Sequence, residues 1–201
     1  MELVDEAPRV TTAGRPRALF DPPGGVLMWI VVILELSVFT IIFGVIAYLR
    51  SSDEVAFALG QRSLSPAHGL VLTLLLMTSG WLTAEAVHRV RGGEIAQARR
   101  YYAAAVATGA IFVVVKVVDY VHKTQSGLTL GASDFWDVYF LSTGFHLLHV
   151  LVGLVLLAYV GARAGRTTFE DEETTVAGTA LFFHMCDLAW FFLFPLLYVR
   201  S

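Results

Sequence analysis

Long apolar runs alternate with short polar segments along the whole chain, a pattern typical of multi-pass membrane proteins. The five apolar runs cover residues 26–49, 67–88, 103–122, 138–160 and 176–199. The hydrocarbon core of a bilayer is about 30 Å thick, and about 20 helical residues cross it. Each run therefore predicts one transmembrane helix, and residues 26–201 are expected to form an all-α membrane bundle.

The first 25 residues have a different character, with prolines and charges of both signs. They predict a flexible tail. The first apolar run begins too late and is too long for the core of a signal peptide, so we expect it to be retained as a helix.

Basic residues predict the orientation of the bundle. Lys and Arg are more frequent in the tail and in the segments after the second and fourth runs than on the opposite side. By the positive-inside rule, the N-terminus is expected in the cytoplasm and the C-terminus outside. Aromatic residues near the predicted span ends are expected to anchor the helices at headgroup level, namely Trp29, Tyr48, Trp136, Tyr139 and Tyr198.

Composition narrows the function classes. Hydrophobic residues make up 56% of the chain and charged residues 15%, which leaves too much apolar surface for a soluble domain of 201 residues. The net charge of −3 provides no basic surface for nucleic acid, so no nucleic-acid partner is expected. Cys186 is the single cysteine, which excludes an intramolecular disulfide.

Glu35 is the most informative residue of the first run, because a carboxyl group about 14 Å into a helix lies near the bilayer midplane. Three interpretations remain open. Glu35 is a proton-relay group, a hydrogen-bonding group for a lipid headgroup or a neighbouring helix, or a protonated acid bound to a backbone carbonyl.

Ionisable residues in the second and third runs suggest a buried polar network. Lys116 and Asp119 are three residues apart and share a helix face, which predicts an ion pair. Lys116 also has Glu35 and Glu85 as candidate partners on other helices, and His88 ends the second run near Glu85. Interhelical contact is one interpretation of the network, and a proton or ion path is the other.

The histidines invite a metal or haem hypothesis. His146 and His149 share one helix face, and His184 and Asp187 repeat this spacing in the last run. Di-metal sites in helix bundles use Glu-x-x-His motifs, which neither histidine pair forms. We therefore expect structural hydrogen bonds and no metal site at these residues.

At these same residues the chain resembles subunit III of the haem-copper cytochrome c oxidases. Five separate motifs, in order and spacing, carry the resemblance. They are Glu35 within Leu34–Phe39, the turn Arg91–Glu94, Asp119 with Tyr120, Thr143–His146 with His149 and Gly153, and His184–Trp190 followed by Tyr198.

The resemblance implies a non-catalytic subunit without a redox centre, packed on catalytic subunit I, with subunit II as a further expected partner. Haem and copper are then expected in the catalytic subunit, and phospholipid is a candidate ligand of this chain. The family glutamate that matches Glu35 is a carbodiimide-reactive carboxylate near bound phospholipid, and the subunit supports sustained proton uptake. Glu35 would then be a regulatory or lipid-site carboxylate. The implied location is the bacterial inner membrane, as a multi-pass protein.

Longer family members have two further helices ahead of the first span, which form a lipid cleft, whereas this chain resembles the short bacterial form.

Two alternatives to an oxidase subunit stay open. Lys116 stands where the oxidase branch usually has a neutral residue, which also suggests the subunit-III-like accessory proteins of nitric oxide reductase. A small ion or solute transporter is the alternative from another class, although inverted repeats and broken helices are not apparent in the sequence.

Overall fold

The computed structural model describes residues 22–165 and 172–199, and these residues are almost entirely helical. The helices are α1 (Gly25–Ser52), α2 (Glu54–Arg62), α3 (Pro66–Arg91), α4 (Ile95–Gln125), α5 (Asp134–Arg163) and α6 (Glu172–Tyr198). All except α2 are long and apolar enough to cross a membrane, which makes five spans among the described residues. The predicted all-α bundle of five membrane helices is therefore confirmed. Residues 1–21 of the predicted tail lie outside the described residues.

Most of these helices extend beyond the apolar runs that predicted them. The clearest case is α4, which begins at Ile95 although its apolar run begins at residue 103. The extra turns carry Arg99 and Arg100. Hydropathy detects only the part of a helix that lies in hydrocarbon, so a polar first turn escapes it.

Local sequence signals set several helix boundaries. The Ser65 hydroxyl caps α3 by accepting the His68 amide, and Pro66 occupies the first turn, where no amide donor is needed. Ser133 caps α5 in the same way. The turn between α3 and α4 contains Gly93 at a φ of 75°, a conformation that favours glycine.

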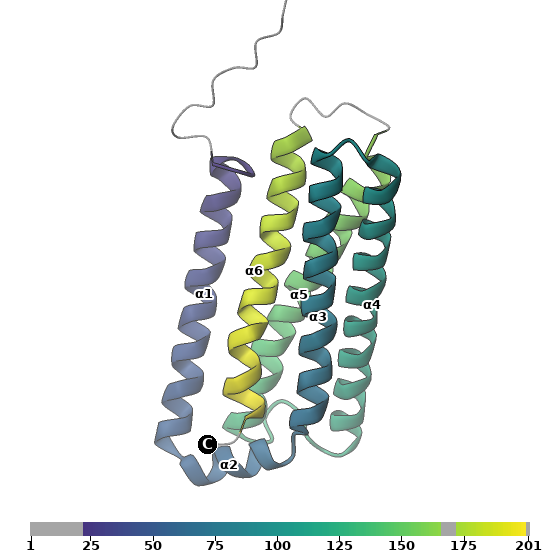
Figure 1. Cartoon of the computed structure of the whole chain (residues 1–201). Coiled ribbons are helices and arrows are strands. Elements are labelled where there is room, and N and C mark those ends of the chain that lie inside the picture. The colour runs from purple at the N-terminus through teal and green to yellow at the C-terminus, as the bar shows by residue number, and fades with distance from the viewer. Residues whose placement is uncertain (1–21, 166–171, 200–201) are drawn as a thin grey trace, which may run out of the picture.

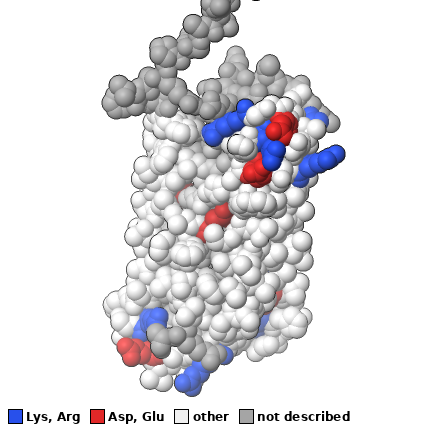
Figure 2. Space-filling view, viewed as in Figure 1, with Lys and Arg blue, Asp and Glu red and all other residues white. Residues whose placement is uncertain are grey.

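The bundle is organised around α6, which packs against α1, α3 and α5, while α4 packs against α3 and α5 (Figure 1). The helix α1 lies at the edge of the bundle and leaves much of its apolar surface exposed. The beginning of α1 and the end of α6 lie at opposite ends of the bundle (Figure 1). Charged residues of both signs gather near these two ends, and the belt between them is mostly uncharged apart from an acidic patch (Figure 2). The cytoplasmic assignment of the N-terminal end stays a prediction.

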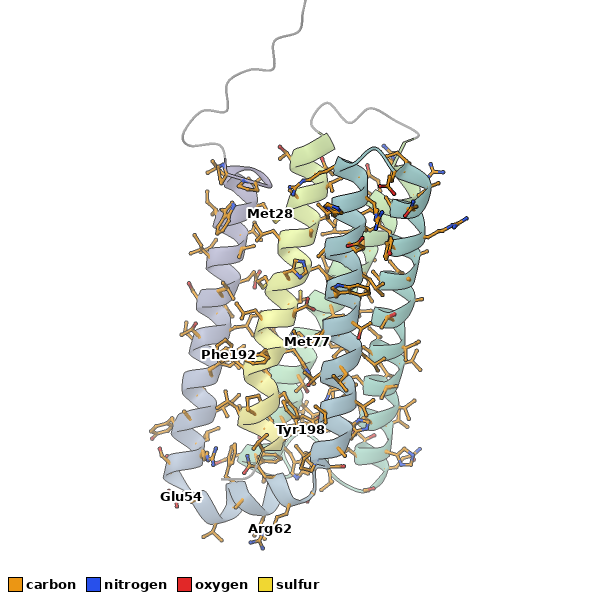
Figure 3. All side chains as sticks on the ribbon, viewed as in Figure 1. Met28, Glu54, Arg62, Met77, Phe192 and Tyr198 are labelled. Carbon is orange, nitrogen blue, oxygen red and sulfur yellow. The ribbon has the colours of Figure 1, made fainter. Side chains whose placement is uncertain are left out.

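Small and flexible residues bring α1 onto α6. A side chain on Gly24 would place its Cβ 2.8 Å from Gly178 Cα, so the close approach of the two backbones requires glycine at position 24. Met28 and Phe192 lie in the space between the same two helices (Figure 3). Phe192 contacts Phe43 of α1 with a ring-centroid distance of 5.8 Å.

The short helix α2 runs across the end of the bundle at which α6 finishes (Figure 1). Its buried Phe57 packs edge-to-face on Phe135 of α5. The Gln61 side chain donates hydrogen bonds to the carbonyl of Leu196, in the last turn of α6, and to that of Val199, just after the helix. This helix was not predicted, because nine residues are too few to produce a span signal in hydropathy.

The predicted aromatic anchors differ in their exposure. Trp29 and Tyr48 are 38% and 68% exposed, so both can reach the headgroups, and their anchoring role stays a prediction. The prediction is wrong for Trp136, Tyr139 and Tyr198, which are buried in the bundle. These three side chains make contacts inside the bundle, and the hydroxyls of Tyr139 and Tyr198 bind Lys116.

Candidate functional site

Two polar centres lie inside the bundle at different depths. We call Glu35 and His149 the carboxylate–histidine pair, and we call Lys116, Asp119, Lys123, Tyr139 and Tyr198 the lysine cluster. The helix α5 contributes to both, since His149 and Tyr139 lie on its buried side. His146 lies between them on the same helix.

The carboxylate–histidine pair joins α1 to α5. Glu35 Oε2 lies 3.0 Å from His149 Nε2, and the two side chains are 29% and 11% exposed. The other ring nitrogen, Nδ1, is 2.8 Å from the Phe145 carbonyl oxygen. Because a carbonyl only accepts, Nδ1 must carry a hydrogen. The partner of Glu35 is thus a histidine on another helix and not a backbone carbonyl.

This geometry determines the proton count of the pair. With a hydrogen on Nδ1, a neutral imidazole offers only a lone pair at Nε2, and an ionised carboxylate offers only lone pairs as well. A hydrogen bond between them therefore requires one additional proton, carried either by Glu35 as an acid or by His149 as an imidazolium. In both cases the pair is electrically neutral, which suits its contact with the Phe39 and Phe182 rings.

In the lysine cluster, Lys116 is a fully buried cation at 0% exposure. Its Nζ donates to the hydroxyls of Tyr139 at 2.7 Å and Tyr198 at 3.1 Å, and it lies 3.5 Å from Asp119 Oδ2. Three acceptor groups thus face the three N–H donors of the ammonium. Neither Glu35 nor Glu85 contacts Lys116, since Glu35 pairs with His149 and Glu85 pairs with Arg89.

Aromatic rings complete the enclosure of the lysine. Its Nζ lies between 4.5 and 5.7 Å from four ring centres, those of Tyr120, Tyr139, Trp190 and Tyr198. Asp119 also pairs with Lys123, and it accepts a 2.7 Å hydrogen bond from the Tyr139 hydroxyl. The cluster therefore fastens α4, α5 and α6 together at one depth.

His146 is fully buried and is surrounded mainly by rings. It stacks on Trp190 with a centroid distance of 5.2 Å and contacts Phe39 and Phe112 by its edges. Neither ring nitrogen has a hydrogen-bond partner among the described residues. The predicted structural hydrogen bonds are therefore wrong for His146, whose contacts are aromatic.

The remaining predicted residues lie apart from these centres. Glu85 binds Arg89, which also binds Glu94 in the turn after α3. His88 is exposed, so its expected place in a buried network is wrong; it projects from the outer face of the last turns of α3.

The pair of His184 and Asp187 also stands by itself. His184 Nδ1 lies 3.1 Å from Asp187 Oδ2, and the histidine side chain is 42% exposed. The Asp187 carboxyl fits against α3 because Gly80 has no side chain there. Among the described residues, no group of three or more His, Cys, Asp or Glu could hold a metal ion.

The predicted ion pair of Lys116 with Asp119 is confirmed, but sequence reasoning missed the two tyrosine partners of Lys116. Tyr139 and Tyr198 were assigned to the membrane surface because they lie near span ends. A buried ammonium needs three acceptors, and one aspartate supplies too few. The need for further acceptors points to hydroxyl-bearing residues near the ends of adjacent spans. A search for them would have found both tyrosines.

A comparison with known families decides the relationship. The sequence model of the family "Cytochrome c oxidase subunit III" matches residues 24–201. The chain belongs to the cytochrome c oxidase subunit III family. Residue 24 precedes α1 directly, so the match includes every described helix. The predicted family resemblance is confirmed.

Individual subunit III proteins share between 25% and 29% of aligned residues with this chain. The cytochrome c oxidase subunit 3 of Corynebacterium diphtheriae is 29% identical over 69% of this chain and 68% of its own length. A probable cytochrome c oxidase subunit 3 of Nocardia farcinica is 25% identical over 94% of this chain and 92% of its own length. The quinol oxidase subunit 3 of Bacillus spizizenii is 26% identical over 66% of this chain and 65% of its own length. Subunit 3 proteins named for both cytochrome c oxidase and quinol oxidase are thus similar to this chain.

Proposed function

We propose that this chain is the non-catalytic subunit III of a haem-copper oxidase in a bacterial inner membrane, where it stabilises the catalytic subunit and supports its proton uptake. The match of the family model to residues 24–201 carries the proposal. The five apolar helices agree with a multi-pass membrane subunit. The expected partners are catalytic subunit I, which would hold the haem and copper, and subunit II.

The carboxylate–histidine pair is the part of the chain best suited to proton uptake. It holds one exchangeable proton in a neutral state, and Glu35 keeps 29% of its side chain exposed. We propose that Glu35 is a regulatory carboxylate: its proton exchanges during turnover, while electron transfer proceeds in the partner subunit. Its single-proton hydrogen bond to His149 supports this role.

The lysine cluster supports the stabilising role. It connects three membrane helices through one buried cation, so the bundle can present a fixed surface to a partner subunit. Its full set of acceptors favours a structural centre over an ion path, because each donor already has a partner.

Copurification tests the proposal. The chain, tagged at one terminus and extracted in mild detergent, is expected to bring with it a larger subunit with haem absorption bands and to consume oxygen. Mass spectrometry identifies the partner, and a cytochrome c or quinol substrate then distinguishes the electron donor. A haem-free protein that purifies alone in good yield would contradict the proposal, and consumption of nitric oxide in place of oxygen would move the chain to the nitric oxide reductase branch.

A further inference from the structure

A groove between α4 and α5 lies away from both polar centres. It encloses about 520 Å³. Its floor is formed by buried Tyr102 and Leu157, and its sides carry exposed alanines, among them Ala103 and Ala107. The groove exists because its lining residues are small, so neighbouring larger side chains do not meet across it.

The groove extends into one membrane leaflet only. On α4 its lining runs from Arg99 to Ala110, which is about 16 Å at the helical rise per residue. From Ala103, where the apolar run begins, the lining covers about 10 Å of hydrocarbon, which is less than one leaflet of about 15 Å. A transmembrane helix of a partner would need a groove along the whole hydrocarbon core, whereas a single acyl chain occupies only one leaflet.

The polar end of the groove is basic. Arg99 lies at its mouth and donates to the Ala164 carbonyl at 2.9 Å from Nε and 2.6 Å from Nη2. These bonds to a neutral carbonyl hold the guanidinium in place without neutralising its charge, and further N–H groups of the guanidinium remain for an anion. Within residues 22–165 and 172–199 Arg99 has no acidic partner.

A second cation lies at the same end of α5. Arg163 is in the last turn, and its guanidinium is 4.9 Å from the Tyr159 ring centre. Arg100 follows Arg99 on α4. Figure 2 shows Lys and Arg side chains, with Asp and Glu among them, near the end of the bundle where α4 begins. Arg100 lines a different hollow, together with Leu82 and Tyr101. An anionic group at the mouth of the groove would therefore meet Arg99 directly, with Arg163 at the same end of the neighbouring helix.

We propose that the groove binds one acyl chain of an anionic phospholipid from the leaflet at the arginine-rich end, with the phosphate on Arg99. The acyl chain would lie along the alanines toward the midplane, as far as the end of the groove near Ala110. This site is separate from Glu35, which lies on α1. The proposal does not depend on the function of the oxidase complex.

A photoactivatable phosphatidylglycerol, with a diazirine on its acyl chain, tests the proposal. The tagged full-length chain, with its copurified subunits, is placed in phosphatidylcholine vesicles that contain the probe and is then irradiated. We expect labelling of peptides from 99–110 and 157–162. A matched phosphatidylcholine probe should label these peptides at least threefold less, and added inorganic phosphate should not compete.

Variants test the apolar groove and the basic end of the site separately. A103L with A107L fills the groove and should remove most of the labelling, whereas the control A84L, the same change at an exposed position of α3, should preserve it. R99Q with R163Q should reduce the preference for phosphatidylglycerol to near equality. Equal labelling by both probes in the wild-type protein, which needs no variant to fold, would overturn the proposal. So would the absence of label from peptides 99–110 and 157–162 in the wild-type protein, which is the result expected if a partner subunit covers the groove.

Discussion

The Tyr139 hydroxyl accepts a hydrogen bond from Lys116 and donates one to Asp119, each over 2.7 Å. One phenol thus lies between a buried cation and its counter-ion and transmits the attraction between them. The Lys116 and Asp119 atoms themselves are 3.5 Å apart. The stability of the cluster should therefore depend on Tyr139 as strongly as on the ion pair.

We expect Tyr139→Phe to destabilise the protein more than Tyr198→Phe. The first change removes an acceptor from Lys116 and a donor from Asp119, while the Tyr198 hydroxyl makes no bond to Asp119. Loss of a buried partner costs about 1–3 kcal/mol per group left unsatisfied. Thermal unfolding of the purified protein measures the difference, with exposed Tyr48→Phe as the control. Equal melting temperatures for the two buried variants would show that the bridge is unimportant.

Asp119→Ala with Lys116 retained should reduce the yield of assembled protein more than the double variant Lys116→Ala, Asp119→Ala. The single change leaves a buried ammonium without its counter-ion, which typically costs about 3–5 kcal/mol. The double change removes both charges, and Lys123, near the end of α4, can turn toward water. Quantifying the chain in purified membranes gives the answer. Similar yields of both variants would refute the charge argument.

Glu35→Gln should leave assembly and the initial turnover rate nearly unchanged, while activity decays faster during sustained turnover. The glutamine amide can still donate to His149 Nε2, so the contact between α1 and α5 survives, but it cannot exchange a proton. Oxygen consumption followed over many turnovers measures the decay. Glu54→Gln, an exposed position in α2, serves as the control. An immediate, large loss of electron transfer in a fully assembled variant would contradict the regulatory role.

Two glycines of α5 should respond oppositely to alanine. At Gly153 a Cβ would lie 2.8 Å from the buried Phe183 ring, so Gly153→Ala should cost about 1–3 kcal/mol through overpacking. At Gly144 nothing lies within 4 Å of the added Cβ, and Gly144→Ala should stabilise the helix by up to about 1 kcal/mol. Melting temperatures of the tagged chain in detergent compare the pair. A stable Gly153→Ala variant would mean that α5 and α6 pack less closely than the structure shows.

The sequence alone determined the number and positions of the membrane helices, because hydrocarbon admits only long apolar helices and hydropathy records this directly. It also placed Glu35, Lys116, Asp119 and the histidines inside the spans. Those residues had several candidate partners, since spacing along one helix says nothing about its rotation toward the next.

Only the tertiary structure decided between the candidates. It paired Glu35 with His149, separated by more than a hundred residues, and it turned Tyr139 and Tyr198 inward to Lys116. The same packing left His88 on the outer surface and revealed the groove beside Arg99. The physical reason is that a membrane span tolerates a polar group at many positions, whereas its energy depends on which neighbouring helix supplies the hydrogen-bond partner.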